Sequence, residues 1–242
     1  MLNTMILYAI TCFTGAMIQS LCGFGSGMVL MSALPHFIHS YSFSLVLSTL
    51  ASLVTCVSIV AKEYRHINVR MIIPVIIGNV VAITSVMLFW SGDADSAMKK
   101  ILGGFLILLS LYFVFLNRNI RIKPTLKAGL LTGLIGGTAN AFFSMGGPPI
   151  ALYMMAASKN TKEYIASSQA YFCFSAIYVT ISRYMRGMVT NDVWPFILAG
   201  VPLVAIGTWV GLKLFGLLNE EKLRFIIYIF MAASGAVMIL TN

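Results

Sequence analysis

Charged residues are scarce in this sequence of 242 residues. They make up 10% of it, whereas an ordinary soluble domain carries about a quarter. Hydrophobic residues make up 59%, and the mean hydropathy is +0.92. The net charge of +9 comes from basic residues in short clusters between apolar stretches, as in proteins that follow the positive-inside rule. We therefore expect a polytopic membrane protein in a lipid bilayer, with no nucleic-acid partner.

The apolar stretches also lack acidic residues, and no group of residues typical of catalysis is present. An active site or metal site needs several His, Cys, Asp or Glu side chains that converge. His36 and His39 can share one helical face, but two ligands are too few. The four cysteines form no CxxC pair: Cys12, Cys22, Cys56 and Cys173. The sequence thus predicts no enzyme, no metal site and no cofactor.

Long runs without charge predict an all-α fold. About 20 apolar residues in a helix cross a bilayer core of about 30 Å. Runs near that length are Tyr41–Ala61, Met71–Trp90, Ile101–Asn117, Tyr164–Ser182, Val193–Leu212 and Phe225–Thr241. Two longer stretches without charged residues remain, 1–61 and Ala128–Ser158.

Each of the two longer stretches contains a glycine cluster, Gly23–Gly27 in the first and Gly146–Pro149 in the second. A continuous helix over Ala128–Ser158 would be about 45 Å long, too long for one crossing. Both stretches are therefore predicted to be broken helices. Unpaired backbone groups are tolerated at membrane depth only where they are buried in protein or line a watery cavity, so the breaks predict a cavity near the bilayer midplane.

The two halves of the chain resemble each other. An offset of about 120 residues places Gly27 on Gly147 and Ser48 on Ser168. We expect a single membrane domain of two pseudo-symmetric repeats, residues 1–122 and 123–242, each with one broken or re-entrant helix followed by three transmembrane helices. Gly/Pro-interrupted segments at matching positions are typical of transporter binding sites.

The basic clusters bear on the orientation of the repeats. If each broken segment crosses the membrane, the 16 Lys and Arg residues divide nine against seven. If each is a re-entrant hairpin, the clusters at 62–70, 118–127, 159–162 and 213–224 share one side, twelve against four. Lys99, Lys100, Arg183 and Arg186 are then loop charges on the other side. The orientation rule favours the second arrangement, with inverted repeats and both termini outside, although oblique crossings remain an alternative.

The breaks also predict the binding residues. The free N–H groups and the positive dipole end of a helix favour an anion, and Pro148 suits a first turn. Hydroxyl and amide side chains near the breaks or at matching repeat positions complete the candidate site. We expect substrate to be bound by Gly25, Ser26, Gly27, Ser48, Asn140, Ser144, Gly146, Gly147, Pro148, Ser168 and Gln169. The alternative is that the glycines only allow close helix packing.

The glycine motifs resemble those of a known family. Met145-Gly146-Gly147-Pro148-Pro149 in the second half, the glycine-rich break in the first half and the duplicated length are similar to the sulfite exporter TauE/SafE family. The first motif differs from the family's commoner run of glycines in having Phe24 and Ser26. The resemblance implies a multi-pass protein of the bacterial inner membrane that exports sulfite, sulfoacetate or a related organosulfonate.

We therefore expect an exporter of a small sulfur-containing oxyanion. The missing acid within the spans agrees with export driven by the membrane potential, because proton-coupled carriers usually keep an ionisable residue there. One alternative is an uptake permease or channel for another small solute or anion. Another is an assembly or sensor protein whose breaks serve packing. The apolar outer faces would permit a homodimer.

Overall fold

A computed structural model describes residues 2–89, 95–112, 114, 123–214 and 220–241, and these residues contain helices and no strand. The helices are α1 (Leu2–Cys22), α2 (Ser26–Phe37), α3 (Tyr41–Glu63), the short 3-10 helix η1 (Tyr64–His66), α4 (Val69–Phe89), α5 (Asp95–Leu111), α6 (Leu126–Phe143), α7 (Gly147–Ala157), α8 (Thr161–Met185), α9 (Val193–Leu214) and α10 (Glu220–Thr241). By length and composition, the segments Asn3–Cys22, Tyr41–His66, Val69–Phe89 and Val193–Leu214 are long and apolar enough to cross a membrane. The all-helical, multi-pass class expected from the sequence is confirmed.

Helices occupy all six of the predicted spans, and both predicted breaks are present. The expected ends at Trp90 and Asn117 lie outside the described residues. The first break separates α1 from α2, and the second separates α6 from α7. In each case a long helix is followed by a short one of 12 or 11 residues, which at 1.5 Å per residue is about 17 Å and covers roughly half of a bilayer core.

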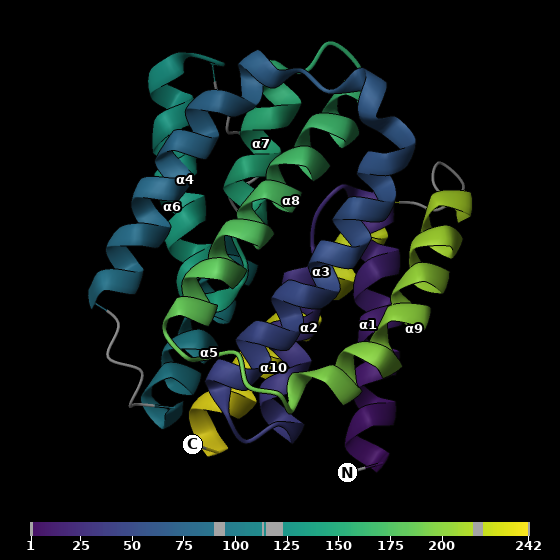
Figure 1. Cartoon of the computed structure of the whole chain (residues 1–242), viewed down its shortest axis with the longest axis vertical. Helices are drawn as coiled ribbons and strands as arrows, with labels where there is room; N and C mark the ends of the chain where they lie inside the picture. The colour runs from purple at the N-terminus through teal and green to yellow at the C-terminus, as the bar shows by residue number, and fades with distance from the viewer. Residues whose placement is uncertain (1, 90–94, 113, 115–122, 215–219, 242) are drawn as a thin grey trace.

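Each broken segment is a hairpin of one long and one short helix. The short helix α2 packs on α1, and α7 packs on α6. The first bend is formed by Gly23 and Gly25, which have φ values of 79° and 116°, a region that only glycine adopts readily. Figure 1 shows α1 rising from the N-terminus and both chain termini at the lower end of the molecule.

The helix starts are fixed by local capping. The side chains of Ser40, Thr125 and Asn160 accept hydrogen bonds from the backbone of the first turns of α3, α6 and α8. Such caps satisfy N–H groups that have no partner within the helix. The first turn of the short helix α7 instead contains Pro148 and Pro149, whose missing N–H groups cost nothing there.

Close backbone contacts join helices that are distant in the sequence. α1 packs along α9, and α4 packs along α6. A Cβ added at Gly207 would collide with the carbonyl of Phe13 in the first pair, and one at Gly133 would collide with the carbonyl of Val75 in the second. Gly103 of α5 lies equally close to α10, where its Cβ would be 2.7 Å from Gly235 O. Small residues at such crossings are the usual means of helix association in membranes.

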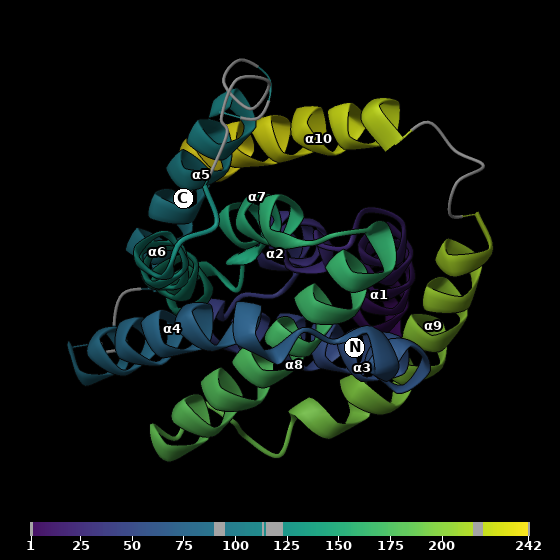
Figure 2. The same cartoon turned by 90° about the horizontal axis from the view of Figure 1, so that it is seen from above.

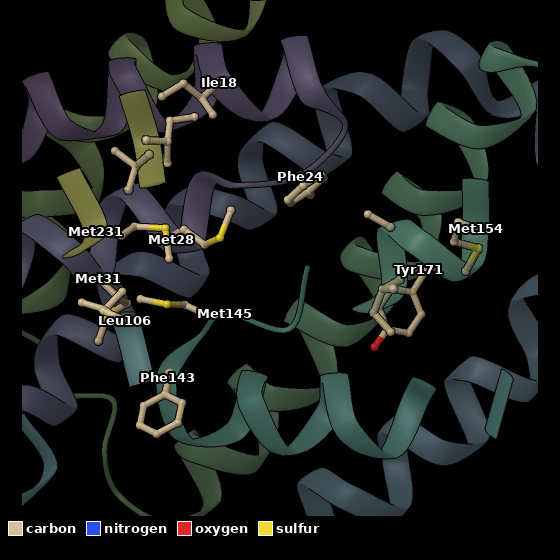
Figure 3. Close-up of a cluster of buried hydrophobic side chains, with 14 of the residues drawn as sticks. Ile18, Phe24, Met28, Met31, Leu106, Phe143, Met145, Met154, Tyr171 and Met231 are labelled. Carbon is tan, nitrogen blue, oxygen red and sulfur yellow. The ribbon is translucent and has the colours of Figure 1, made fainter. Parts of the chain in front are cut away.

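The two short helices lie at the centre of the bundle. Figure 2 shows α2 and α7 surrounded by the longer helices, with α5 and α10 along one side. The largest buried apolar cluster contains Phe24 and Met145, one from each bend, together with Met28, Met154 and Tyr171. In Figure 3, Met28 and Met145 lie together with Met231 on one side of the view, and Tyr171 of α8 lies on the other. The core of the protein is therefore built around the two breaks.

Replacing Gly27 tests whether the two hairpins must touch. A Cβ at Gly27 would collide with the carbonyl of Ser144, and neither backbone can move without shifting a helix. We expect Gly27→Ala to lower the free energy of unfolding by about 1–3 kcal/mol, measured as a fall in melting temperature in detergent. Gly104→Ala is the matched control, because no atom of the described residues, apart from its own helix backbone and chain neighbours, lies within 4 Å of a Cβ there. Equal melting temperatures for the two variants would contradict the close contact.

Candidate functional site

A cavity of about 60 Å³ lies where the two bends meet. Its lining comes from both hairpins and from α3 and α8. The polar lining side chains are Gln19, Thr49, Ser52, Asn140, Ser144, Tyr171 and Ser175, and the lining glycines are Gly25, Gly27, Gly146 and Gly147. No charged side chain is among the lining residues. The cavity is roughly four to six times the minimum needed for one water molecule, so it has room for a few waters or one small ion.

The N-terminal ends of α2 and α7 both face this cavity. α2 begins at Ser26 after Gly25, and α7 begins at Gly147 after Gly146. N–H groups in a first helical turn have no partner within the helix, and they carry the positive end of the helix dipole. In α7 the two prolines at 148 and 149 carry no N–H, so the free donors are concentrated at Gly146 and Gly147. Two converging helix starts form a site suited to an anion.

Hydroxyl groups add further polar contacts to the cavity wall. Thr49 Oγ1 lies 3.0 Å from Ser144 Oγ. Ser52 Oγ lies 3.0 Å from Ser26 Oγ, on the side of the first bend. A hydroxyl can rotate to donate its hydrogen to a bound oxyanion. The wall thus offers donors from both hairpins and from α3.

An amide network holds the α8 face of the cavity. Asn140 Nδ2 donates to Ser175 Oγ at 2.8 Å. Ser175 Oγ and Tyr171 Oη both donate to Asn79 Oδ1, at 3.1 and 2.9 Å. Buried polar groups joined in this way keep one fixed geometry. Asn140 is therefore held with its amide group at the cavity surface.

Six of the eleven residues expected from the sequence line the cavity: Gly25, Gly27, Asn140, Ser144, Gly146 and Gly147. The other five lie outside the lining. The Ser26 hydroxyl reaches only the lining residue Ser52, and Pro148 is buried in the first turn of α7. Ser48 and Ser168 are fully buried, and their hydroxyls have no hydrogen-bond partner within the described part of the chain.

Gln169 has a different position from the one expected. It is buried beside the first bend, where its Nε2 donates to the Gly23 carbonyl at 2.7 Å. Its Oε1 accepts a hydrogen bond from Gln19 Nε2 at 2.9 Å. Gln19 itself lines the cavity. Gln169 thus holds the bend and the Gln19 amide, and it does not face the cavity.

Arg183 is the main residue that the sequence interpretation misplaced. It was expected as a loop charge, but it lies in the last turn of α8 with 0% of its surface exposed. Its guanidinium donates to Thr49 Oγ1 at 2.5 Å and to Ser144 Oγ at 3.1 Å, directly behind the cavity wall. Arg183 comes seven residues, about two helical turns, after the lining residue Ala176 and so lies on the same face of α8, but no pattern in the sequence alone marks that face.

The sulfite exporter TauE/SafE family matches residues 7–238 of this chain. The matched range includes both bends and every residue that lines the cavity. The chain belongs to the sulfite exporter TauE/SafE family. No curated protein and no solved structure was found to match it.

Membership of the TauE/SafE family makes this a multi-pass membrane transporter of sulfite or related anions. The cavity agrees with that role, because it offers N–H and O–H donors and its lining includes no carboxylate to repel an anion. Among the described residues, no three His, Cys, Asp or Glu side chains are close enough to hold a metal ion. The family match and the polar lining of the cavity therefore both agree with transport of an anion.

A second cavity of about 350 Å³ lies at the corner between α7 and α8 in this TauE/SafE protein. It is lined by Cys22 and Gly23 of the first bend and by Lys159 and Tyr164 of the corner. Tyr164 Oη donates to the Cys22 carbonyl at 3.3 Å. The first bend borders both cavities, because Gly23 lines this one and Gly25 lines the smaller one. The second cavity is thus a vestibule that shares the first bend with the central site.

Glu163 fixes the corner beside this vestibule. Its Oε1 accepts a hydrogen bond from Asn68 Nδ2 at 2.6 Å, and its Oε2 accepts one from the Lys159 N–H at 2.9 Å. These two bonds hold the pKa of Glu163 below its usual value. The carboxylate therefore joins the start of α8 to the start of α4.

Two replacements of Ser144 separate its backbone role from its hydroxyl role. Ser144 has a φ of 54°, which costs about 1 kcal/mol for a residue with a side chain and nothing for glycine. We expect Ser144→Gly to be about 1 kcal/mol more stable than Ser144→Ala in detergent melts. Both variants lack the hydroxyl, so at low anion concentration both should show an anion flux about tenfold below that of the wild type. Wild-type flux in Ser144→Gly would contradict a binding role for the hydroxyl.

Proposed function

We propose that this protein exports a small sulfur-containing oxyanion from the cytoplasm and binds it between the two helix breaks, at the middle of the bilayer. One observation carries the proposal: the N-terminal ends of α2 and α7 meet at one cavity with no acidic lining residue. In the middle of a membrane an anion needs donors that replace its water shell. The free N–H groups of Gly146 and Gly147, with the hydroxyls of Thr49 and Ser144, supply them.

The size of the cavity favours sulfite over the larger organosulfonates. A cavity of about 150 Å³ in another protein holds one benzene molecule, and this cavity is about 60 Å³. Sulfite, a sulfur atom with three oxygens, is smaller than benzene. Sulfoacetate adds two carbons and a second charged group, for which this arrangement has no space. We therefore place sulfite first and sulfoacetate second among the cargo candidates.

The distribution of charge supports export. The vestibule lies at the corner that carries Lys159 and Lys162, one of the clusters that the positive-inside rule assigns to the cytoplasm. Burial of Arg183 strengthens this assignment, because it removes one of the four basic residues counted on the opposite side. In a bacterial inner membrane, a potential negative inside drives each anionic charge outward with about 2.3 kcal/mol per 100 mV. The vestibule would thus collect an anion from the cytoplasm for export.

Matching contacts in the two halves support a pair of inverted repeats. The packing of α1 on α9 corresponds to that of α6 on α4, and the packing of α3 on α9 corresponds to that of α8 on α4. Thus α1 and α3 of the first half pack on α9 of the second half, and their counterparts α6 and α8 pack on α4 of the first half. We propose that the repeats 1–122 and 123–242 rock against each other around the bound anion, as in other transporters with inverted repeats.

Efflux from proteoliposomes tests the function. We expect sulfite efflux that accelerates under an imposed inside-negative potential and exceeds sulfoacetate efflux. Gly147→Leu should reduce sulfite efflux at least about tenfold, because its side chain would occupy the start of α7 beside Phe24. Gly104→Leu is the matched control, since among the described residues nothing outside its own helix backbone and chain neighbours lies within 4 Å of a Cβ there.

Three outcomes would contradict this proposal. Folded wild-type protein that moves no small sulfur anion would reject the cargo. Equal efflux from Gly147→Leu and Gly104→Leu would reject the location of the site. Flux that runs only inward would favour the uptake permease.

A further inference from the structure

Arg183 is a buried positive charge that has no acidic partner among the described residues. Five acceptors surround its guanidinium: the carbonyls of Leu45, Asn140 and Ala141 and the hydroxyls of Thr49 and Ser144. All five are uncharged. The single ion pair among the described residues, His66 with Glu63, lies elsewhere. A buried charge without a counter-charge is costly and is seldom kept without a function.

Part of this charge is balanced by the end of a helix. The carbonyls of Asn140 and Ala141 belong to the last turn of α6, where the helix dipole is negative. A helix end offers only about half a charge, so it compensates the guanidinium incompletely. If the only role of Arg183 were to hydrogen-bond the last carbonyls of α6, an uncharged donor would do this equally well. Moreover, the Nε of Arg183 is buried with no hydrogen-bond partner in the described part of the chain.

The remaining contacts lead toward the cavity. Thr49 and Ser144 line it, and Arg183 Nη1 donates to both of their oxygens. An N–H donor occupies a lone pair of each hydroxyl oxygen and leaves the hydroxyl hydrogen free to be donated onward. Without an anion, each hydroxyl can donate its hydrogen to the Leu45 carbonyl or to the oxygen of the other hydroxyl. With an anion in the cavity, they can turn to it.

We propose that Arg183 is a positioning residue that gives the cavity its preference for anions, with the cargo serving as its missing counter-charge. Arg183 does not touch the cargo. It acts through Thr49 and Ser144, whose hydroxyls it polarises and orients toward the cavity. This inference rests on the proposed function, because it requires an anion in this cavity. The inference adds Arg183 as a source of the selectivity for anions, which the N-terminal ends of α2 and α7 alone would provide only in part.

The test compares ligands of one shape and different charge. Methanesulfinate and dimethyl sulfoxide both have a pyramidal sulfur, but only the first is an anion. Their apparent dissociation constants are measured from thermal stabilisation of the full chain in detergent. Wild type should prefer methanesulfinate. Arg183→Met should reduce this preference about tenfold, whereas Arg183→Lys, which keeps the charge, should retain most of it.

A second pair of variants keeps the test valid if Arg183→Met does not fold. Thr49→Val removes one hydroxyl and leaves the arginine and its carbonyl contacts in place, so it should lower the methanesulfinate preference severalfold. Thr55→Val is the control: Thr55 is buried in the same helix, donates to its own helix at Ala51 O and does not line the cavity. This control should leave the preference unchanged.

The outcomes distinguish the inference from the function on which it rests. If Arg183→Met or Thr49→Val weakens both ligands equally, Arg183 is only a structural support and the inference is wrong. If wild type shows no preference for the anion, the inference is also wrong. If wild type prefers methanesulfinate but transports no sulfite in proteoliposomes, the proposed export fails while the role of Arg183 stands.

Discussion

The two breaks leave backbone N–H groups without helical partners at membrane depth, and the rest of the structure is arranged around these groups. Lipid cannot hydrogen-bond them, so they must be covered by protein or face a polar cavity. The bundle does both: the longer helices surround α2 and α7 (Figure 2), and the starts of these two helices face a small cavity with a polar wall. The need to satisfy the backbone thus places the polar cavity at the centre of the fold.

Close packing and buried charge then shape that site. Gly27 allows the first hairpin to reach the backbone of Ser144 in the second, so that donors from both hairpins face one volume. Arg183 joins the end of α6 to α3 through the Leu45 carbonyl and Thr49. Methionines at both bends, Met28 and Met145, fill the space between the hairpins. Their flexible side chains suit an interface that the proposed rocking of the two repeats would move.

The fold class, both breaks and about half of the site could be predicted from the sequence. Runs without charge and glycine clusters have direct physical consequences in lipid, and Gly25, Gly146 and Gly147 do line the cavity. Their binding of substrate stays a prediction. Ser48 and Ser168 were chosen by repeat position, which fixes the helix but not the face that meets the cavity. Arg183 was missed because a charge next to a span ordinarily marks its end. Only the structure shows that α8 continues past Ser182, the predicted end of the span, and that Arg183 is buried within the bundle.

The central claim is that an oxyanion binds between the starts of α2 and α7. The most direct test is a crystal of the protein soaked in selenite, the selenium counterpart of sulfite, with data collected at the selenium absorption edge. The account predicts an anomalous peak between Gly27 and Gly147, within hydrogen-bonding reach of the Thr49 or Ser144 hydroxyl. A peak only at the basic surface clusters, such as the corner near Lys159, with none in the central cavity, would contradict it.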